Sequence, residues 1–360
     1  MPKKPSPLKK LETLPPTYDS YEWADYIELL CLANKDGRVS KADVLDFVRE
    51  RKRDLNEGHP LEGSEAEEKD IEDEMEVEDE YEDDEDIDEE TPEPALADDK
   101  WDIRGSDWFR HLEYRSGAFV EFYPFRVIKG GTVLVLSGSK ARLSVQRKLY
   151  IFLLLASNLR YLSQSDQTSI ASIFEVASFH ALETYLPSGS NLYMFGKHGL
   201  NKSGPYSSGT LWEKLNRIAA DIREKVVCKK SDFKPSNTGD AGLDLIAWLP
   251  LEIGSEMRRG FFVVFGQCAC TRRWVEKQFE TSYDTWKNYL SFTVYPTRLT
   301  FIPYCFRKAT GSWHDYNKIS ATVVVDRLRL TNLLRGKHST LRPHIIAHVN
   351  DVLQNAVFTL

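Results

Sequence analysis

An acidic run in the N-terminal third of the chain is the feature that most limits how the chain can fold. Residues 65–90 contain 19 Asp or Glu and a single Lys, a net charge of −18 over 26 residues. Such a segment cannot bury enough apolar area to offset the entropy cost of ordering it, and its charges repel one another. We therefore expect an acidic disordered linker over 58–98, with a folded part on either side of it.

The acidic run also hides the charge of the rest of the chain. All 360 residues together carry a net charge of −8, and setting aside the −18 of the run leaves the other residues at +10. A basic folded part favours a nucleic-acid partner. The run itself is interpreted either as a solvated spacer or as a tethered polyanion that competes with nucleic acid for a basic groove or docks on a basic partner.

The apolar runs and the cysteines exclude several classes of protein. The longest apolar run, 149–156, is too short to span a membrane, and no apolar stretch follows the basic N-terminus. We therefore expect a cytoplasmic protein without a membrane partner. The five cysteines are odd in number and lack a CxxC pair, which argues against a disulfide framework or a zinc site.

Residues 1–57, before the acidic linker, predict a helical hairpin. Apolar residues from Tyr21 to Ala33 recur at helical spacing, and the segment 34–37 then breaks the helix. Ser40 followed by Asp43 has the pattern of a second helix start. A helix-turn-helix that reads DNA and a module for partner docking or dimer formation are equally consistent with this pattern.

After the linker, residues 99–164 predict a β-rich and helical lead-in, and residues 165–360 predict a core with C-terminal strands and a closing helix. Strands are expected at 118–125, 132–136, 291–295, 299–302 and 321–325. Helices are expected at 144–162, 168–186 and 208–227. Asp326 and Arg327 are expected to start the closing helix with a local ion pair. The order of elements indicates a mixed α/β fold.

Two neighbouring strand-like segments carry the clearest chemical pattern. The first runs from Gly239 to Trp248 with Asp244 at the mouth of the strand, and the second, 261–270, is apolar on both faces until Gln267. Glycines before Asp244 let the backbone turn tightly there. A carboxylate and an oxygen donor that converge at adjacent strand ends suit Mg²⁺, which prefers hard oxygen ligands and keeps part of its water shell.

This pattern resembles a known family. The run Gly-Asp-Ala-Gly-Leu-Asp at 239–244, followed 23 residues later by Gln267, is similar to the signature of the Mrr-like branch of the PD-(D/E)xK restriction-endonuclease superfamily. The resemblance covers about residues 165–305 and implies a restriction-endonuclease-like α/β core with a central mixed sheet flanked by helices. By position, Asp244 and Gln267 match metal-binding residues, and Glu175 looks like the glutamate that many members place on the preceding core helix. The implied cofactor is Mg²⁺, for which Mn²⁺ can substitute.

The chain departs from the family pattern at one position. Ala269 stands where the family signature has a lysine. Superfamily members that lost this lysine sometimes supply it from the helix after the strand. We therefore expect Lys277 to take the role, on a helix that runs from Arg272 to Tyr289.

Four further basic residues are candidate contacts to the nucleic-acid backbone. Arg272 and Arg273 directly follow the second strand and can bind phosphate in a bidentate manner. Lys197 and Lys202 lie in the loop 196–203, which lacks the glycine pattern of an ATP-binding loop.

These expectations describe a Mg²⁺-dependent DNA endonuclease that cleaves phosphodiester bonds by metal-activated water. Asp244 and Gln267 bind the metal, Glu175 assists, and Lys277 stabilises the attack. A looser resemblance to restriction-endonuclease-like proteins of bacterial defence gene clusters implies a role in anti-phage defence. The implied partners are DNA, a separate ATPase or other defence-system subunit, and a second copy of the chain.

Two alternatives stay open. One is a catalytically inactive nuclease-fold subunit that binds DNA or scaffolds a defence complex. The other is an interaction protein whose acidic run recruits a basic partner.

Overall fold

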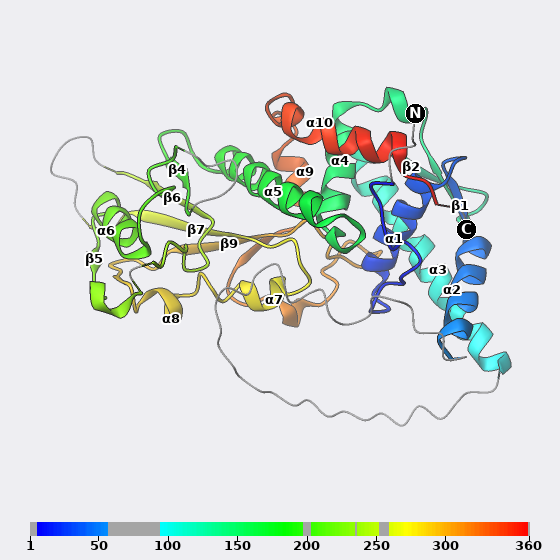
Figure 1. Ribbon diagram of the computed structural model, residues 1–360, viewed down its shortest axis with the longest axis horizontal. Coiled ribbons are helices and arrows are strands. Elements are labelled where there is room, and N and C mark those ends of the chain that lie inside the picture. The colour runs from blue at the N-terminus through cyan, green and yellow to red at the C-terminus, as the bar shows by residue number, and fades with distance from the viewer. Residues whose placement is uncertain (1–5, 57–93, 197–202, 235, 252–258, 359–360) are drawn as a thin grey trace.

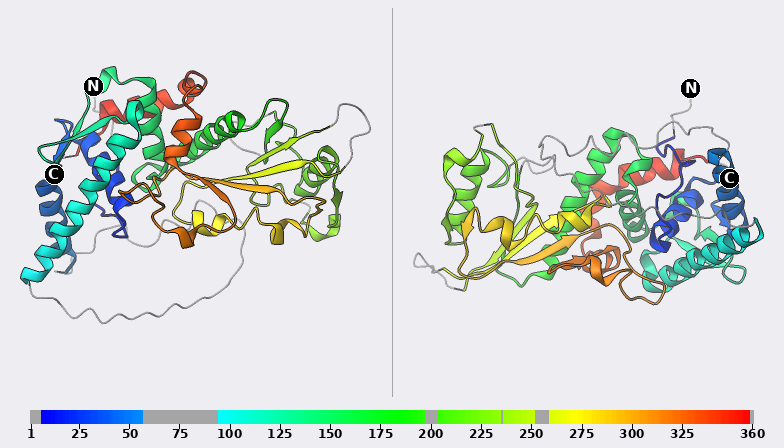
Figure 2. Two further views of the ribbon diagram at one scale, coloured as in Figure 1. Left: turned by 180° about the vertical axis from the view of Figure 1, so that it is seen from behind. Right: turned by 90° about the horizontal axis from the view of Figure 1, so that it is seen from below.

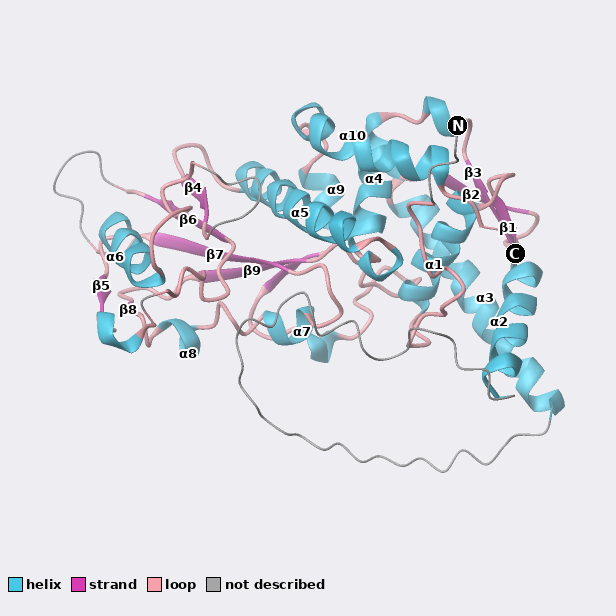
Figure 3. Cartoon of the chain, viewed as in Figure 1, coloured by secondary structure: helices cyan, strands magenta, loops and turns pink. Residues whose placement is uncertain are grey.

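The computed structural model describes residues 6–56, 94–196, 203–234, 236–251 and 259–358. Most of the helices gather at one end of an elongated molecule, and a sheet forms the other end (Figures 1 and 2). A second, smaller sheet lies among the helices (Figure 3). The described part of the chain is therefore an α/β protein with a helix-rich end and a sheet end.

The helices have the following bounds: α1 Ser20–Ala33, α2 Lys41–Asn56, α3 Pro94–Ala118, α4 Val145–Ala156, α5 Gln164–Tyr185, α6 Leu211–Asp221, α7 Trp274–Lys277, α8 Tyr283–Trp286, α9 Arg327–Leu333 and α10 His338–Asn355. Several begin at the polar residues that favour helix starts. Ser144 caps α4 by accepting a hydrogen bond from the Arg147 N–H, and Ser40 and Asp43 bond reciprocally ahead of α2.

The strands have the following bounds: β1 Arg38–Ser40, β2 Phe125–Ile128, β3 Val133–Leu136, β4 Asn191–Met194, β5 Lys225–Val226, β6 Leu245–Leu249, β7 Phe262–Cys268, β8 Leu290–Ser291, β9 Thr297–Phe301 and β10 Val323–Val325. The main sheet has five strands in the order β10-β9-β7-β6-β4. Its β4, β6 and β7 are antiparallel, whereas β7, β9 and β10 are parallel, so the sheet is mixed. The expected central mixed sheet flanked by helices is confirmed.

The two faces of the main sheet pack against different helices. Leu245, Ala247 and Val264 point into the large core that also contains the apolar side of α5. Ile246 and Phe265 point the other way, into a second cluster built with α6 and α8. The alternation of side chains along β6 and β7 thus buries both faces, as their nearly continuous apolar sequence predicts.

The N-terminal helix α1 is part of the large core. Every residue from Tyr21 to Ala33 is buried, and the apolar side chains of α1 share one hydrophobic cluster with those of α4, α5 and α10. The predicted division of the chain into domains stays a prediction, but α1 is not a detached helix.

The prediction was wrong in several segments, of which three lie in or near the lead-in and the C-terminal strands. The expected start of the β-rich lead-in is the long helix α3, which Pro94 begins, so the predicted linker ends inside a helix. The segment 118–125 is mainly the end of α3 and a 3₁₀ turn, with β2 starting only at Phe125. The segment 291–295 contributes only Ser291 to a strand. The rest of the predicted linker, up to residue 93, lies outside the described residues.

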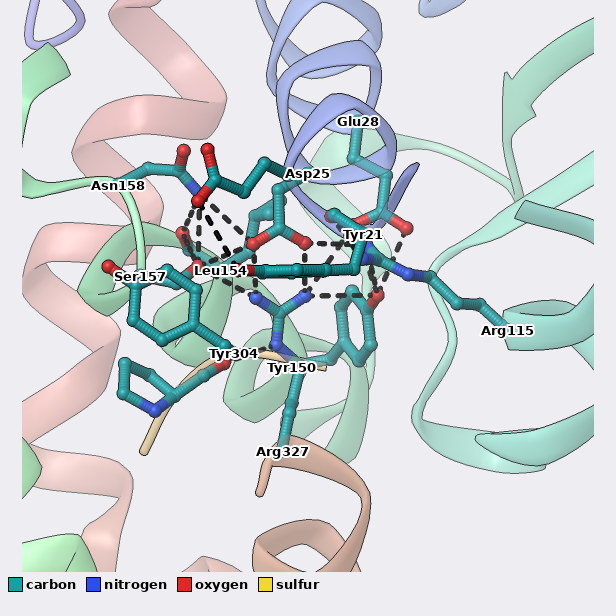
Figure 4. A network of polar contacts seen from close by, with 12 residues as sticks. Tyr21, Asp25, Glu28, Arg115, Tyr150, Leu154, Ser157, Asn158, Tyr304 and Arg327 are labelled. Atoms are coloured by element: carbon teal, nitrogen blue, oxygen red, sulfur yellow. Dashed lines mark hydrogen bonds and ion pairs between the residues drawn. The ribbon is translucent and has the colours of Figure 1, made fainter. Parts of the chain in front are cut away.

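A buried network of charged side chains joins helices that are far apart in sequence (Figure 4). Arg327 at the start of α9 donates to both carboxylate oxygens of Asp25 on α1, at 2.9 and 2.7 Å. Arg115 on α3 donates to Asp25 at 2.6 Å and lies 3.0 Å from the carboxylate of Glu28. Tyr150 on α4 donates to Glu28 at 3.0 Å. The network ties α1, α3, α4 and α9 together.

The same network corrects the predicted ion pair at the start of the closing helix. Asp326 does cap α9, accepting from the Arg329 N–H, but its ion pair is with Arg307 at 2.6 Å. Arg327 turns inward to Asp25 instead.

Across the described ranges, no helix is both long and apolar enough to cross a membrane.

Candidate functional site

The antiparallel hairpin of β6 and β7 brings the two predicted metal-binding residues together. Leu245 pairs with Gly266, and the Asp244 N–H donates to the Gly266 carbonyl at 3.1 Å. This register places Asp244, just before β6, beside Gln267 near the end of β7. The two residues are thus neighbours in the backbone pairing, and their shared role as metal ligands stays a prediction.

Asp244 is held firmly in place. Its Oδ2 accepts a hydrogen bond from the Cys268 N–H at 2.6 Å, and its carbonyl accepts one from the Phe195 N–H at 2.7 Å. The side chain is 8% exposed. The carboxylate therefore helps to join the ends of β6 and β7, whatever else it binds.

Gln267 makes one hydrogen bond and leaves one oxygen unsatisfied. Its Nε2 donates to the Glu280 carboxylate at 3.0 Å. Its Oε1 is buried and has no hydrogen-bond partner among the described residues. A buried polar atom without a partner is unusual in a folded protein and requires an explanation, such as a bound ion or water.

Glu280, in the short connection between α7 and α8, is a site residue that the sequence analysis missed. Besides Gln267, it packs against the turn before Asp244. A Cβ added to Gly242 would lie 2.5 Å from the Glu280 Cβ, and Gly242 has a φ of +71°. Glycine is required there both for the backbone conformation and for the approach of Glu280.

Glu175 reaches the opposite side of this strand end. It lies in the middle of α5, since that helix begins at Gln164 rather than near Thr168. Burial raises the pKa of the Cys268 thiol, and the nearby carboxylates of Asp244 and Glu175 raise it further. Asp244 and Glu175 thus both lie near Cys268, on β7.

The predicted helix from Arg272 to Tyr289 is wrong, because the segment forms two single-turn helices. Ser282 caps the start of α8 by accepting a hydrogen bond from the Thr285 N–H. The buried Trp286 donates to the Glu280 carbonyl at 3.1 Å. Lys277 is the last residue of α7 and is half-buried, three residues before Glu280. Its proposed role stays a prediction.

Ala269 lies in a small hydrophobic cluster. It is 1% exposed and shares the cluster with Trp274, Phe306 and Tyr21 of α1. A lysine at this position would have to place its ammonium group among these rings, which is costly. The packing of α1 against the end of β7 thus gives a physical reason for the absence of a lysine at position 269.

The residues predicted to contact nucleic acid differ in their exposure and in their partners. Arg272 donates to Glu22 of α1 at 3.0 Å, and Arg273 is exposed at the start of α7. Lys197 and Lys202 lie outside the described residues. Arg273 is therefore the predicted contact with the most open position among those described.

In the described part of the chain, no group of three His, Cys, Asp or Glu side chains is arranged to hold a metal ion. A metal at this strand end would accordingly need the Gln267 oxygen and water as further ligands. Mg²⁺ is commonly bound by one or two carboxylates with several waters, so the oxygen donors present fit this ion.

Comparison with known proteins finds no matching family model, no matching curated protein and no matching solved structure. The geometry of the strand end and the sequence pattern that leads to it are accordingly the basis for a functional proposal.

Proposed function

We propose that this chain is a metal-dependent DNA endonuclease whose active site lies at the end of the β6–β7 hairpin. The observation that carries the proposal is the buried, unsatisfied Oε1 of Gln267, a residue that neighbours Asp244 across the β6–β7 pairing. The mixed sheet and the basic charge outside the acidic run support it further.

The roles of the residues follow from their positions. Asp244 and Gln267 would hold Mg²⁺ or Mn²⁺ through oxygen atoms, and Glu175 and Glu280 add negative charge nearby. The bound ion would activate water and neutralise the charge that develops on the phosphate. Lys277 or Arg273 would bind the DNA backbone.

The biological setting proposed is bacterial defence, with DNA as substrate and a separate ATPase or other subunit as partner. It rests on the resemblance of the sequence pattern, which gives no further residue-level detail. A homo-oligomer is compatible with this setting.

A second candidate is a catalytically inactive nuclease-fold subunit that binds DNA. The burial of Ala269 favours it, because no lysine follows β7 in the family position. The low exposure of Asp244 and Gln267, 8% and 3%, favours it too.

The test is cleavage of plasmid DNA with Mg²⁺, with Mn²⁺ and with a chelator, comparing the natural chain with Asp244→Asn. An asparagine keeps an oxygen that can accept from the Cys268 N–H, so the variant removes charge with little change in packing. The matched control is Asp284→Asn, because Asp284 is an exposed carboxylate on α8 that pairs with Lys287.

Metal-dependent cleavage that Asp244→Asn loses and Asp284→Asn retains is the expected result. DNA binding by the natural chain without cleavage in either metal would support the inactive subunit instead. Cleavage that survives in Asp244→Asn would rule out this strand end as the active site.

A further inference from the structure

A hollow lies at the helix-rich end of the molecule, away from the β6–β7 hairpin. Its volume is about 440 Å³, within the range of small-ligand sites of roughly 300–1,000 Å³. Residues from the end of α3, the start of β2, the turn after β3 and the first turn of α4 line it. Figure 3 shows β2 and β3 at the opposite end of the molecule from β6 and β7.

Two arginines from different elements line this hollow. Arg126 on β2 is exposed, and its side chain forms no hydrogen bond or ion pair with any residue that the structure describes. Arg147, in the first turn of α4, uses one nitrogen to donate to the Ser137 carbonyl at 3.0 Å. Each guanidinium carries five N–H donors, so most of the donors of this pair are unused within the described chain.

The remaining polar groups of the hollow fit an anion. No acidic residue is among the described residues that line it. The Ser137 Oγ is buried without a hydrogen-bond partner in the described chain, and Ser137 itself is 9% exposed. Its backbone N–H donates to the Pro124 carbonyl at 2.7 Å, which fixes the serine in the wall of the hollow. A second hydroxyl comes from Ser116.

We propose that this hollow binds a small phosphate-bearing ligand of about the size of a nucleoside monophosphate. Two guanidinium groups match the double negative charge of a phosphate monoester and bind its oxygens in the paired geometry that arginine favours. The serine hydroxyls supply further hydrogen bonds. This site is separate from the proposed nuclease site and does not depend on it.

Titration calorimetry on the full chain tests the proposal with three probes: inorganic phosphate, a nucleoside monophosphate and the same nucleoside without phosphate. The variant is Arg126→Gln, and the matched control is Arg142→Gln, an exposed arginine that does not line the hollow. Arg126 has no described partner to lose, so the melting temperature of Arg126→Gln should equal that of the natural chain.

We expect the monophosphate to bind and the nucleoside not to bind. Arg126→Gln should weaken the binding of the monophosphate at least about tenfold, and Arg142→Gln should leave it unchanged. Equal affinity in the natural chain and Arg126→Gln, or no heat from either phosphate probe at millimolar concentration, would overturn the proposal. Binding of inorganic phosphate alone would overturn the assigned ligand size.

Discussion

His111 on α3 is a neutral imidazole held between a carbonyl group and a cation. Its Nε2 lies 2.8 Å from the Arg307 carbonyl, and its Nδ1 accepts from the Arg115 Nε at 3.1 Å. Burial and, to a smaller extent, the charge of Arg115 lower the pKa of His111 to about 3. Protonation of Nδ1 would remove this hydrogen bond, because the new N–H would point at the N–H of Arg115.

This arrangement predicts a pH dependence of stability. The folded-state pKa lies below the value of 6.5 for a free histidine. The stabilisation is therefore full above pH 6.5 and is lost as the pH falls toward 3, by about 1.4 kcal/mol per pH unit. Urea unfolding at several pH values should show this loss in the natural chain and a shallower slope in His111→Gln. Equal slopes would show that His111 titrates normally in the folded chain.

Arg327 is one of two fully buried arginines that offset the charge of the buried carboxylates. Burial alone would raise the pKa of the Asp25 carboxyl, but Arg327 and Arg115 outweigh this effect and lower it. Burial raises the pKa of Glu28, an effect that Arg115 partly offsets. Removing one guanidinium would leave a buried carboxylate with too little compensating charge.

We accordingly expect Arg327→Met to lower the free energy of unfolding by about 3–5 kcal/mol in chemical denaturation. The control is Arg110→Met, because Arg110 forms an exposed ion pair with Asp107 on α3. That change should cost less than about 1 kcal/mol. Losses of similar size in the two variants would contradict the role given to the network.

Some of these residues could be predicted from local sequence patterns, and others could not because their contacts are long-range or irregular. Asp244 and Gln267 lie on neighbouring strands with regular alternation, so their adjacency could be predicted. Asp25 and Arg327 are 302 positions apart, and no local pattern connects them. Glu280 lies between two single-turn helices, where no periodic signal marks the direction of a side chain.

At the scale of elements, the end of β7 and the helix α1 depend on each other. Tyr21 of α1 closes the cluster around Ala269, and Glu22 of α1 pairs with Arg272. The N-terminal helix thus supports the loop that leads from Gln267 toward Lys277.

This packing predicts the effect of placing a lysine at position 269. Ala269→Lys should lower the free energy of unfolding by more than about 2 kcal/mol, because the side chain overfills a closed cluster and buries an ammonium group. Ala141→Lys, at an exposed position, should change it by less than about 0.5 kcal/mol. Thermal and urea unfolding measure both. An undiminished stability of Ala269→Lys would mean that position 269 opens toward solvent.

The predictability of the elements varied with their kind. Helix α5 and the hairpin β6–β7 have long, regular patterns and were predicted within a few residues. Helix α3 was not predicted from the sequence. Its buried Trp108, Leu112 and Arg115 nevertheless follow a helical spacing. The helix expected over 272–289 is broken by the Ser282 cap, a local signal that its apolar spacing concealed.

At the scale of the whole molecule, the charge of the chain is divided between the acidic run and the rest. Deleting residues 65–90 removes a net charge of −18 and leaves +10. The affinity for DNA should then rise, and it should fall more steeply with added salt. Fluorescence anisotropy with a labelled duplex at several salt concentrations measures both quantities. An unchanged affinity and salt dependence would show that the run does not compete with DNA.

The overall arrangement could be predicted only in part. The mixed α/β class follows from the order of elements, but the burial of α1 within the large core does not, because its partners on α4, α5 and α10 come later in the chain. Long-range packing of this kind leaves no trace in the local pattern of α1.

The proposed active site requires the strand end at Asp244 and Gln267 to bind a divalent metal. Electron paramagnetic resonance of Mn²⁺ tests it most directly, by titrating the ion into the natural chain, Asp244→Asn and Asp284→Asn in the presence of DNA. We predict one Mn²⁺ bound per chain, with affinity at least about tenfold weaker in Asp244→Asn and unchanged in Asp284→Asn. Equal Mn²⁺ binding by the natural chain and Asp244→Asn would show that Asp244 does not bind the metal.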